Sequence, residues 1–413
     1  MEFKNLTIFE FSKFVIDNSL KNHYQTPEYA SFMIHNGYTC EFVGLTDNNT
    51  VIAASLLLIK KISLTKSYAY APRGFILNYF NNDLFQTFTN KIKLYCQKKH
   101  IIFIKLNPEI FIAEYDYEQN KFINNNNFRL LDSFKNSGYQ KLNHSKPFTS
   151  KLPEYSAIIE LKKANYLDYQ KNTRNKIRKS YKEGLSIEKT SLNKIEEVFS
   201  FIGPKKKKDL NYFRNYVLAF NQNNACDLFL IKINNEEYLD NLKHIYDQEL
   251  DNNNLLVNKM MGKNNNHIID LKIMSDQKLT TIKKNIMIAT KKLQNNKVEY
   301  IASAITVKLQ NRVYILFSGY NPQYKNVSAN YFLHFKLIEY YKYQYLYLDL
   351  NGISGVNEKD NPYYGLDQFK LGFKPRVLQT IGEYDLIINK FEYQKLAKKG
   401  YLDKEFKRQI KSE

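Results

Sequence analysis

Cysteine, tryptophan and long apolar runs are scarce or absent in this sequence. Its 413 residues include no tryptophan and three cysteines, Cys40, Cys96 and Cys226, which do not have the spacing of a metal site. We therefore expect neither a disulfide framework nor a metal site. No segment approaches the roughly 18 apolar residues that span a bilayer, and residues 1–13 lack the basic and apolar regions of a signal peptide. These absences predict a cytoplasmic protein without a membrane span.

Familiar catalytic patterns are absent as well. The sequence has no HExxH, no GxSxG, and no P-loop or GxGxxG after a strand. Hydrolase and kinase interpretations are therefore disfavoured. The seven histidines are scattered along the chain, and we assign no role to any of them, His23 included.

The length and charge of the chain indicate how many folded units it has and what kind of partner it binds. A chain of 413 residues exceeds the roughly 250 to 300 residues at which a single core stops growing, so two folded units are expected. Lysine and arginine total 61 against 41 acidic residues, which gives a net charge of +20. Such a charge favours a polyanionic partner, which nucleic acid, anionic lipid or a phosphorylated substrate would satisfy equally.

One series of elements occurs in each half of the chain. In the first half, β-forming runs predict strands at 41–45, 51–62, 68–70 and 101–106, and helical spacing predicts a helix at 83–98. In the second half, the corresponding strands are 228–233, 299–308, 312–317 and 345–350, with a helix at 329–343. A strand, a helix and a strand in this order predict a mixed α/β (α+β) fold.

Residues 237–296 lack these β signals. Apolar residues recur there at the 3-4-3-4 spacing of a coiled-coil seam, at Leu279, Ile282, Ile286, Ala289 and Leu293. Gly262 and its neighbours mark the midpoint, so the segment predicts two antiparallel helices that form a projecting arm. The arm serves either dimerisation and packing or, given its lysines at 283, 284, 291 and 292, contact with nucleic acid.

The hairpin, strand and helix of each half suggest an N-acetyltransferase (GNAT) sheet. We predict a first GNAT-like domain at 1–150 and a second at 151–236 and 297–413, with the coiled-coil arm at 237–296 inserted in the second. Acetyl-CoA users of this fold need a glycine-rich turn before the helix, and residues 318–322 do not provide it. An acyl-CoA donor is therefore disfavoured, and no cofactor is expected.

Several short runs share one further pattern. They read Y-A-P-R-G-F-I-L at 70–77, N-T-R-N-K-I-R-K at 172–179, Y-G-L-D-Q-F-K-L-G-F at 364–373 and G-E-Y-D-L at 382–386. These runs resemble the signatures of the Fem family, which includes the MurM-like enzymes that build branched peptidoglycan bridges. The predicted arm also falls where that family inserts its coiled coil, so the resemblance covers nearly the whole chain.

The resemblance implies an aminoacyltransferase. Its donor would be aminoacyl-tRNA, and its acceptor the stem-peptide side-chain amine of lipid II or UDP-MurNAc-pentapeptide. Both substrates are polyanions, in agreement with the charge. By resemblance, Lys370 is the cation that stabilises the tetrahedral oxyanion, and Phe369 stacks on the terminal adenine of the tRNA acceptor end. Alternatively, Lys370 is a solvated loop lysine and Phe369 a core residue.

Other basic positions are candidate phosphate contacts. Arg73 contacts either precursor phosphates or a loop carbonyl. Arg174 and Arg178 lie one helical turn apart, where they offer phosphates two guanidinium groups or form a solvated helix face. Lys208 and Tyr212 have the spacing at which the family places an arginine and a tyrosine that hold the precursor.

The sequence departs from the family pattern at three sites. Met33 stands where a precursor-binding lysine commonly lies, after the Q-T-P-E-Y-A run at 25–30. Lys208 replaces the arginine and loses its bidentate geometry. Asn107 replaces an aspartate and cannot act as a base. Asp349 and Glu383 remain as candidate carboxylates, although each is more often a strand-end cap or a structural ion pair.

Three functions therefore remain. The leading hypothesis is transfer of alanine, serine or glycine to a peptidoglycan precursor, with a peripheral contact to the anionic inner face of the membrane. The second is aminoacyl transfer to another acceptor, such as a phospholipid or a protein. The third is a non-catalytic protein that binds tRNA or membrane. Which amino acid is transferred, and the oligomeric state, stay open.

Overall fold

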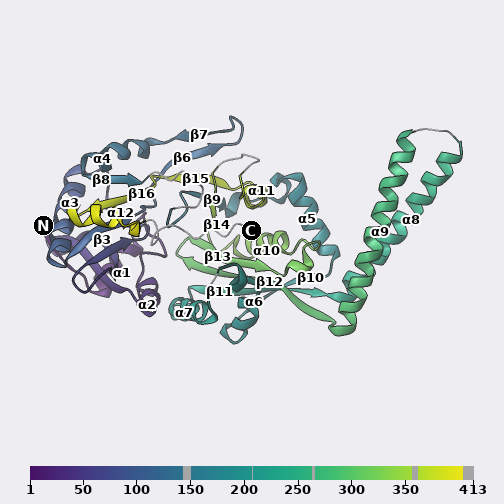
Figure 1. Cartoon of the computed structure of the whole chain (residues 1–413), viewed down its shortest axis with the longest axis horizontal. Helices are drawn as coiled ribbons and strands as arrows, with labels where there is room; N and C mark the ends of the chain where they lie inside the picture. The colour runs from purple at the N-terminus through teal and green to yellow at the C-terminus, as the bar shows by residue number, and fades with distance from the viewer. Residues whose placement is uncertain (143–149, 207, 263–265, 356–360, 403–413) are drawn as a thin grey trace.

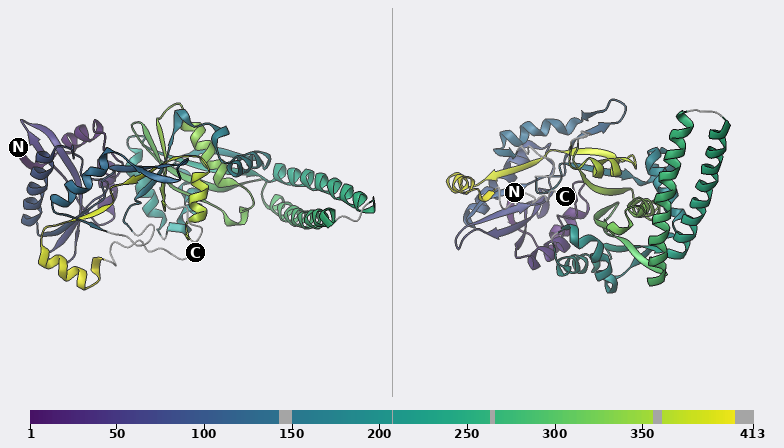
Figure 2. Two further views of the ribbon diagram at one scale, coloured as in Figure 1. Left: turned by 90° about the horizontal axis from the view of Figure 1, so that it is seen from above. Right: turned by 45° about the vertical axis from the view of Figure 1, so that its right-hand side comes forward.

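The body of the molecule contains two β-sheets side by side, and two long helices project from one end (Figure 1). The computed structural model of the chain describes residues 1–142, 150–206, 208–262, 266–355 and 361–402. Seen from above, the arm extends the long axis of the body (Figure 2). In this described part, the mixed α/β architecture expected from the sequence is confirmed. The turn at the tip of the arm was expected at 262–264; Gly262 ends the first arm helix, and residues 263 and 264 lie outside the described residues.

The first sheet has seven strands in the order β1-β2-β3-β4-β5-β16-β8. Its pairs are antiparallel except β4 with β5, which α3 connects. Its strands are β1 (Glu2–Asn5), β2 (Thr39–Asp47), β3 (Thr50–Lys61), β4 (Ser67–Ala71), β5 (Ile101–Leu106), β8 (Tyr139–Leu142) and β16 (Glu383–Ile387).

The second sheet has nine strands in the order β10-β11-β12-β13-β14-β9-β15-β6-β7. Its parallel pair is β13 with β14, which α10 connects, so the hairpin, helix and strand of the first sheet recur here. Its strands are β6 (Phe111–Asp116), β7 (Lys121–Asn124), β9 (Tyr155–Glu160), β10 (Leu185–Thr190), β11 (Cys226–Asn234), β12 (Val298–Leu309), β13 (Arg312–Tyr320), β14 (Tyr347–Ile353) and β15 (Arg376–Thr380).

Strand membership crosses the expected boundary at residue 150. Strands β6 and β7 precede that boundary but pair in the second sheet, because β6 joins β15. Strand β16 comes from the C-terminal part of the chain but lies between β5 and β8 in the first sheet. The sheets therefore exchange strands, and the expected boundaries at 150, 236 and 297 stay a prediction.

Helices cover both sheets. Those beside the first sheet are α1 (Ile8–Ile16), α2 (Pro27–His35), α3 (Asn82–Lys98), α4 (Leu130–Asn136) and α12 (Lys390–Lys398). Those beside the second sheet are α5 (Lys171–Lys182), α6 (Ile195–Lys206), α7 (Leu210–Asn221), α10 (Ala329–Tyr341) and α11 (Tyr364–Leu371). The arm consists of α8 (Asn235–Gly262) and α9 (Asn266–Asn295), which pack against each other.

Local sequence explains several of these boundaries. The β2–β3 turn contains Asn48 at φ 45° and Asn49 at φ 64°, a left-handed geometry that asparagine tolerates and tight hairpins require. Helix α2 begins after Thr26, whose hydroxyl accepts a hydrogen bond from the Tyr29 amide at 3.2 Å, and Pro27 occupies its first turn. Asn81 caps α3 in the same way.

The arm contains a polar layer within its apolar seam. Asn253 donates hydrogen bonds to Ser275 Oγ at 3.0 Å and to Asp276 Oδ1 at 2.9 Å. Ser275 in turn donates to Glu249 Oε1 at 2.6 Å, and Lys278 pairs with the same carboxylate. Apolar residues on either side of this layer, including Leu242, Leu256 and Ile282, are buried. A polar layer of this kind favours a single register between two helices.

A shared core joins the two halves. One apolar cluster lies between α3 and the first sheet, and another between α10 and the second sheet. A third cluster contains Leu56 of β3 together with Tyr314 and Leu316 of β13. Helices α2 and α7 pack together over it. The junction of the sheets is therefore a packed interior, and the candidate site lies there.

Candidate active site

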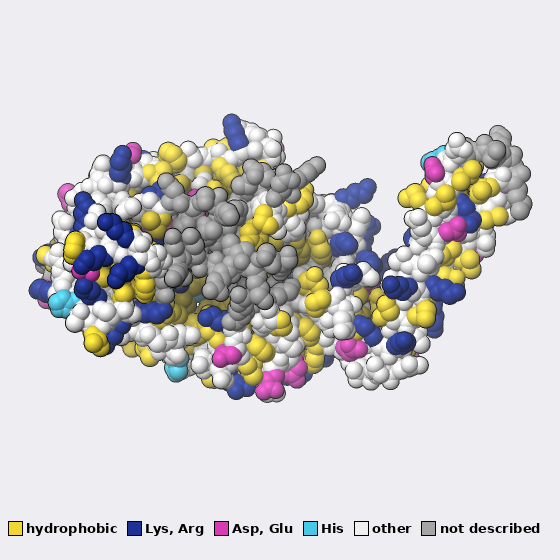
Figure 3. Space-filling model, viewed as in Figure 1, with side chains coloured by type: hydrophobic (Ala, Val, Ile, Leu, Met, Phe, Trp, Pro, Cys, Tyr) yellow, Lys and Arg dark blue, Asp and Glu magenta, His cyan; other side chains and the backbone are white. Residues whose placement is uncertain are grey.

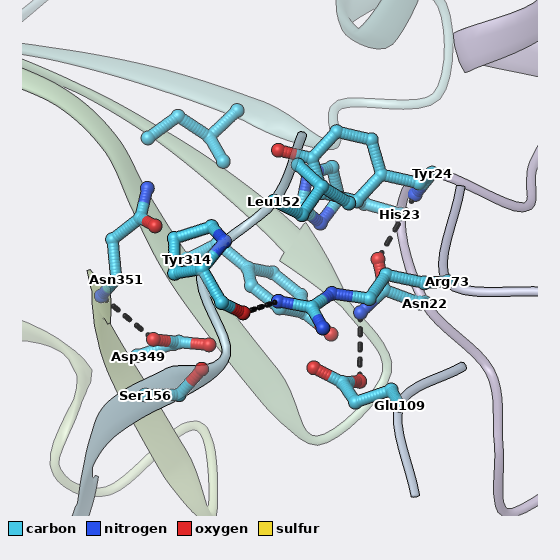
Figure 4. A pocket seen from close by; sticks show the side chains of 12 residues that line it. Asn22, His23, Tyr24, Arg73, Glu109, Leu152, Ser156, Tyr314, Asp349 and Asn351 are labelled. Carbon is cyan, nitrogen blue, oxygen red and sulfur yellow. Dashed lines mark hydrogen bonds between the residues drawn. The ribbon is translucent and has the colours of Figure 1, made fainter. Parts of the chain in front are cut away.

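A pocket opens at the junction of the two sheets (Figure 4). Loops of the first half contribute His23, Arg73 and Glu109, whose side chains converge on one space with Tyr314 of β13. The complete lining is Asn22, His23, Tyr24, Arg73, Glu109, Leu152, Pro153, Ser156, Tyr314, Leu316, Asp349 and Asn351.

Arg73 is held deep in this pocket. Its side chain is 5% exposed, and its Nη2 donates to the carbonyl of Pro153 at 2.8 Å. Its backbone amide donates to Asn107 Oδ1 at 3.1 Å, and its φ of 53° is left-handed. The Nη1 atom is buried without a hydrogen-bond partner in the described structure. The loop-carbonyl contact expected as one alternative is thus present, and one donor remains free.

Two buried carboxylates share one arginine behind the pocket. Arg312 donates to Glu109 Oε2 at 3.2 Å and to Asp349 Oδ2 at 2.5 Å. Burial lowers the pKa of Arg312, but the charges of Glu109 and Asp349 outweigh that effect and raise it, so the guanidinium stays charged. Asp349 is therefore part of an ion pair, which was one of its two expected roles.

His23 is an unexpected member of the site. It is 2% exposed, and neither ring nitrogen has a hydrogen-bond partner in the described structure. Its ring centroid lies 4.4 Å from that of Tyr314. Burial lowers the pKa of His23 well below its ordinary value, and the charges of Arg312 and Arg73 lower it further, so the ring is neutral at pH 7. No sequence pattern singled this histidine out.

Lys370 lies in helix α11 and not on a loop. The side chain is 7% exposed, and its ammonium donates to the carbonyl of Gly352 at 2.7 Å. Gly352 belongs to β14, whose Asp349 and Asn351 line the pocket. The loop-lysine alternative is wrong, because the family-like run folds into a helix whose last turn faces the sheet. The residue of β14 that Lys370 contacts is therefore next in the chain to a residue that lines the pocket.

Phe369 packs in an aromatic cluster. Its ring makes edge contacts with Tyr331 at 4.9 Å, His334 at 4.8 Å and Phe373 at 5.7 Å between centroids. The side chain is half-buried against the apolar cluster between α10 and the second sheet. This geometry shows the core contact expected as one alternative, and stacking on an adenine stays a prediction.

The signature-like runs meet in pairs. Gln25 is fully buried, and its amide donates to the carbonyl of Pro72 at 2.8 Å and accepts from the Leu56 amide at 2.8 Å. Gly372 packs against Thr173, because a β-carbon at Gly372 would lie 2.1 Å from Thr173 Oγ1. The runs at 172–179 and 364–373 are thus in direct contact.

The remaining predicted residues lie away from the pocket lining. Arg174 donates to the carbonyl of Tyr169 at 2.9 Å, and Arg178 is exposed and contacts Asn175. The Lys208 ammonium lies 4.8 Å from the centroid of the Tyr212 ring. Tyr212 lies in the first turn of α7, which packs against α2 with Met33, and Lys208 precedes the N-cap of α7, Asp209. The altered positions Met33 and Lys208 thus occur on α2 and just before the helix that packs against it.

Glu383 forms a buried ion pair and no free carboxylate. Lys105 Nζ lies 3.3 Å from Glu383 Oε1 and 2.9 Å from Asp385 Oδ1, and both carboxylates are almost fully buried. Glu383 also accepts from the amide of Lys151 at 2.9 Å. Burial raises the pKa of Asp385, against the opposing charge of Lys105. The ion-pair alternative for Glu383 is confirmed.

No helix in the described ranges is both long and apolar enough to pass through a bilayer. The exposed face in Figure 3 instead carries lysine and arginine side chains, with a group around α5 and the base of the arm. Arg178 of α5 and, in the middle of α9, Lys283 and Lys284 are exposed. Basic side chains are therefore exposed on both α5 and α9.

Comparisons with known proteins agree with this fold and these runs. Lipid II:glycine glycyltransferase of Staphylococcus epidermidis is 23% identical, over 96% of this chain and 95% of that protein. Aminoacyltransferase FemB of the same species is 25% identical, over 95% of this chain and 96% of that protein. The crystal structure of FemX aligns with a TM-score of 0.71 and 18% identity, over 96% of this chain and 100% of that chain. The model of the FemAB family matches residues 6–399, and the chain therefore belongs to the FemAB family.

Proposed function

We propose that this chain transfers an amino acid from aminoacyl-tRNA to the stem-peptide side-chain amine of a peptidoglycan precursor, and so builds interpeptide bridges. The observation that carries this function is the position of Lys370, buried at the strand that lines the pocket. The relatives, a lipid II:glycine glycyltransferase and an aminoacyltransferase FemB, support the reaction class. Glycine, alanine and serine are the candidate donors.

The chemistry asks for positioning and charge stabilisation. The acceptor nitrogen attacks the ester carbonyl and a C–N bond forms, the C–O bond to the tRNA ribose breaks, and the proton lost by the amine is balanced by the one that the ribose oxygen takes up as it leaves as a hydroxyl. A buried cation stabilises the intermediate oxyanion because it acts in a low dielectric. Lys370 takes this role, while Asn107, an amide, takes none in proton transfer. The donor and acceptor are the only small or large molecules that this reaction requires, so we propose no cofactor.

The tRNA would lie on the exposed basic side chains of α5 and the arm. Arg174 and Arg178 belong to α5, and Lys283 and Lys284 are exposed on α9. Phosphate contacts by such side chains supply affinity that depends on salt. We retain two finer interpretations as part of the proposal: each sheet is a GNAT-like unit, and the arm is a coiled coil.

The acceptor would be lipid II or UDP-MurNAc-pentapeptide. Arg73 stays a candidate contact for this precursor, and Lys208 and Tyr212 stay candidate contacts for its phosphates. We place the reaction at the cytoplasmic face of the membrane, where the net charge of +20 attracts the protein to anionic lipid. This peripheral contact needs no spanning helix.

Mass spectrometry tests the function directly. Purified protein is incubated with a mixed pool of charged tRNAs and with lipid II or its UDP-linked precursor. We expect the stem-peptide amine to gain the mass of one amino-acid residue, which also identifies the donor and the acceptor. Intact precursor and intact charged tRNA would contradict the proposal.

A second acceptor is favoured by Met33 and Lys208. Both depart from the family pattern of precursor-binding residues; Met33 lies on α2, and Lys208 lies two residues before α7, which packs against α2. Transfer to a phospholipid or a protein would consume charged tRNA when that acceptor is supplied and leave lipid II unchanged. A non-catalytic binder would leave the ester intact with every acceptor.

A further inference from the structure

The pocket contains polar atoms that the protein itself does not satisfy. Arg73 Nη1 and both ring nitrogens of His23 are buried without hydrogen-bond partners in the described structure. Both side chains line the pocket and are at least nine-tenths buried, at 5% and 2% exposure. Buried donors are nearly always paired, so unpaired donors that converge on one pocket indicate a place for a ligand.

The charges around the pocket favour an anion. Glu109 and Asp349 are engaged by Arg312, and Asn22 also donates to Glu109 at 2.7 Å. Among the described residues, no carboxylate pairs with the guanidinium of Arg73, whose Nη2 donates to a backbone carbonyl. The charges that act on His23 are those of Arg312 and Arg73. Arg73 is the one arginine or lysine among the residues that line the pocket, so its guanidinium is the group with which an anionic ligand would pair.

A carboxylate matches the free donors better than a phosphate does. One carboxylate can accept from the Arg73 guanidinium through one oxygen and from a His23 N–H through the other. A phosphate dianion would bring a second negative charge next to Glu109 and Asp349, which line the same pocket. A monoanion is thus the better ligand.

We propose that this pocket is a carboxylate subsite in which Arg73 Nη1 and the His23 ring hold a carboxylate of the acceptor peptide. The identity of the ligand as acceptor peptide rests on the proposed function. Asn351 lines the pocket, and the next residue, Gly352, accepts the hydrogen bond from Lys370. A peptide anchored here is held beside the cation at which the ester would react.

Calorimetric titration with a matched pair of peptides tests the subsite. The probes are a lysine-containing pentapeptide with a free C-terminal carboxylate and the same peptide as its C-terminal amide. We expect the acid to bind at least about tenfold more tightly, the effect of one charge-assisted hydrogen bond. Acetate alone should bind more weakly than the peptide acid.

Two variants locate the effect. Arg73→Met removes the guanidinium, and His23→Phe removes both ring nitrogens but keeps an aromatic ring against Tyr314. Each should lose the tenfold preference for the acid. Arg376→Met is the matched control, because Arg376 is an exposed arginine of β15 that pairs with Glu114 of β6, outside the pocket lining, and the change should leave the preference unchanged. Should Arg73→Met not fold, His23→Phe decides.

Three results would overturn the inference: equal binding of acid and amide, an unchanged preference in His23→Phe, or inorganic phosphate binding more tightly than the peptide acid. Transfer to lipid II is measured separately on the same variants, and a raised KM with little change in kcat is expected. Transfer without any acid preference would refute the subsite alone. An acid preference without transfer would refute the proposed function and leave the carboxylate subsite standing.

Discussion

At the scale of single residues, Lys370 offers the sharpest test of catalysis. Lys370→Met should fold, because methionine nearly keeps the volume of the lysine side chain, and the lost hydrogen bond from the charged ammonium to Gly352 is worth about 1.5 to 3 kcal/mol. Turnover should fall by about two to three powers of ten, the usual cost of removing an oxyanion donor. Lys374→Met, at an exposed lysine four residues further on, is the control. Single-turnover transfer measurements decide, and near wild-type rates in Lys370→Met would eliminate the role.

Gly372 supports a prediction about stability. A β-carbon there would approach Thr173 Oγ1 to 2.1 Å, so Gly372→Ala should destabilise the fold by about 1 to 3 kcal/mol. Gly365→Ala, inside helix α11, whose C-cap is Gly372, meets nothing within 4 Å and should stabilise by about 0.5 to 1 kcal/mol. Urea unfolding measures both. In the double variant Gly372→Ala/Thr173→Ala, part of the lost free energy of unfolding should be recovered. If the losses of the two single variants simply add, the contact between Gly372 and Thr173 is not their cause.

The site residues that could be predicted from the sequence lie in continuous runs, and those that were missed come together only in the fold. Arg73 and Lys370 lie in continuous runs whose spacing is visible in the sequence. His23, Glu109 and Arg312 meet only because loops and strands from both halves pack at one junction. A lone histidine has no local signal, since its role depends on burial among distant charges.

At the scale of elements, the arm has a titratable polar layer. Burial alone would raise the pKa of Glu249, but hydrogen bonds from Lys278, Ser275 and Asn252 outweigh it and lower the pKa. Because the pKa of Glu249 is lowered on folding, its charge stabilises the folded arm at pH values above 4.5, the ordinary glutamate pKa. This contribution is lost as the pH falls from 4.5 through the lowered pKa of the folded state.

Hydrogen exchange of the arm measures this contribution. At neutral pH, peptides of α8 and α9 should exchange faster in Glu249→Gln than in the wild type. The difference should shrink below pH 4.5, as the wild-type carboxyl becomes protonated. Asp240→Gln is the control, because Asp240 is an exposed residue of α8 outside the polar layer. A difference that persists in acid would show that the charge of Glu249 is not the cause.

Elements with strong local signals were predicted well. The expected strands at 51–62 and 101–106 correspond to β3 and β5, and the helix at 83–98 to α3, because periodicity and turn residues act within each segment. The short strands β6, β7 and β15 were missed. Their pairing depends on distant partners, such as β6 with β15, and no local pattern reports it.

At the scale of the whole molecule, the charge distribution predicts salt-dependent binding. Lys283→Gln combined with Lys284→Gln should weaken tRNA binding and reduce the slope of log affinity against log salt by about one per lost phosphate contact. Lys398→Gln with Lys399→Gln removes the same charge beside α12, at the far end of the body from the arm (Figure 1). Filter binding across a salt series compares the two, and equal slopes would refute the arm as a tRNA contact.

The position of β16 has a consequence for synthesis of the chain. This strand, Glu383–Ile387, lies between β5 and β8, so the hydrogen bonds of the first sheet cannot be complete until residue 387 has left the ribosome. Until then, the facing edges of β5 and β8 lack their shared neighbour, and unpaired edges invite association with other chains. The nascent chain therefore exposes two strand edges for as long as the more than 200 residues between β8 and β16 are being translated.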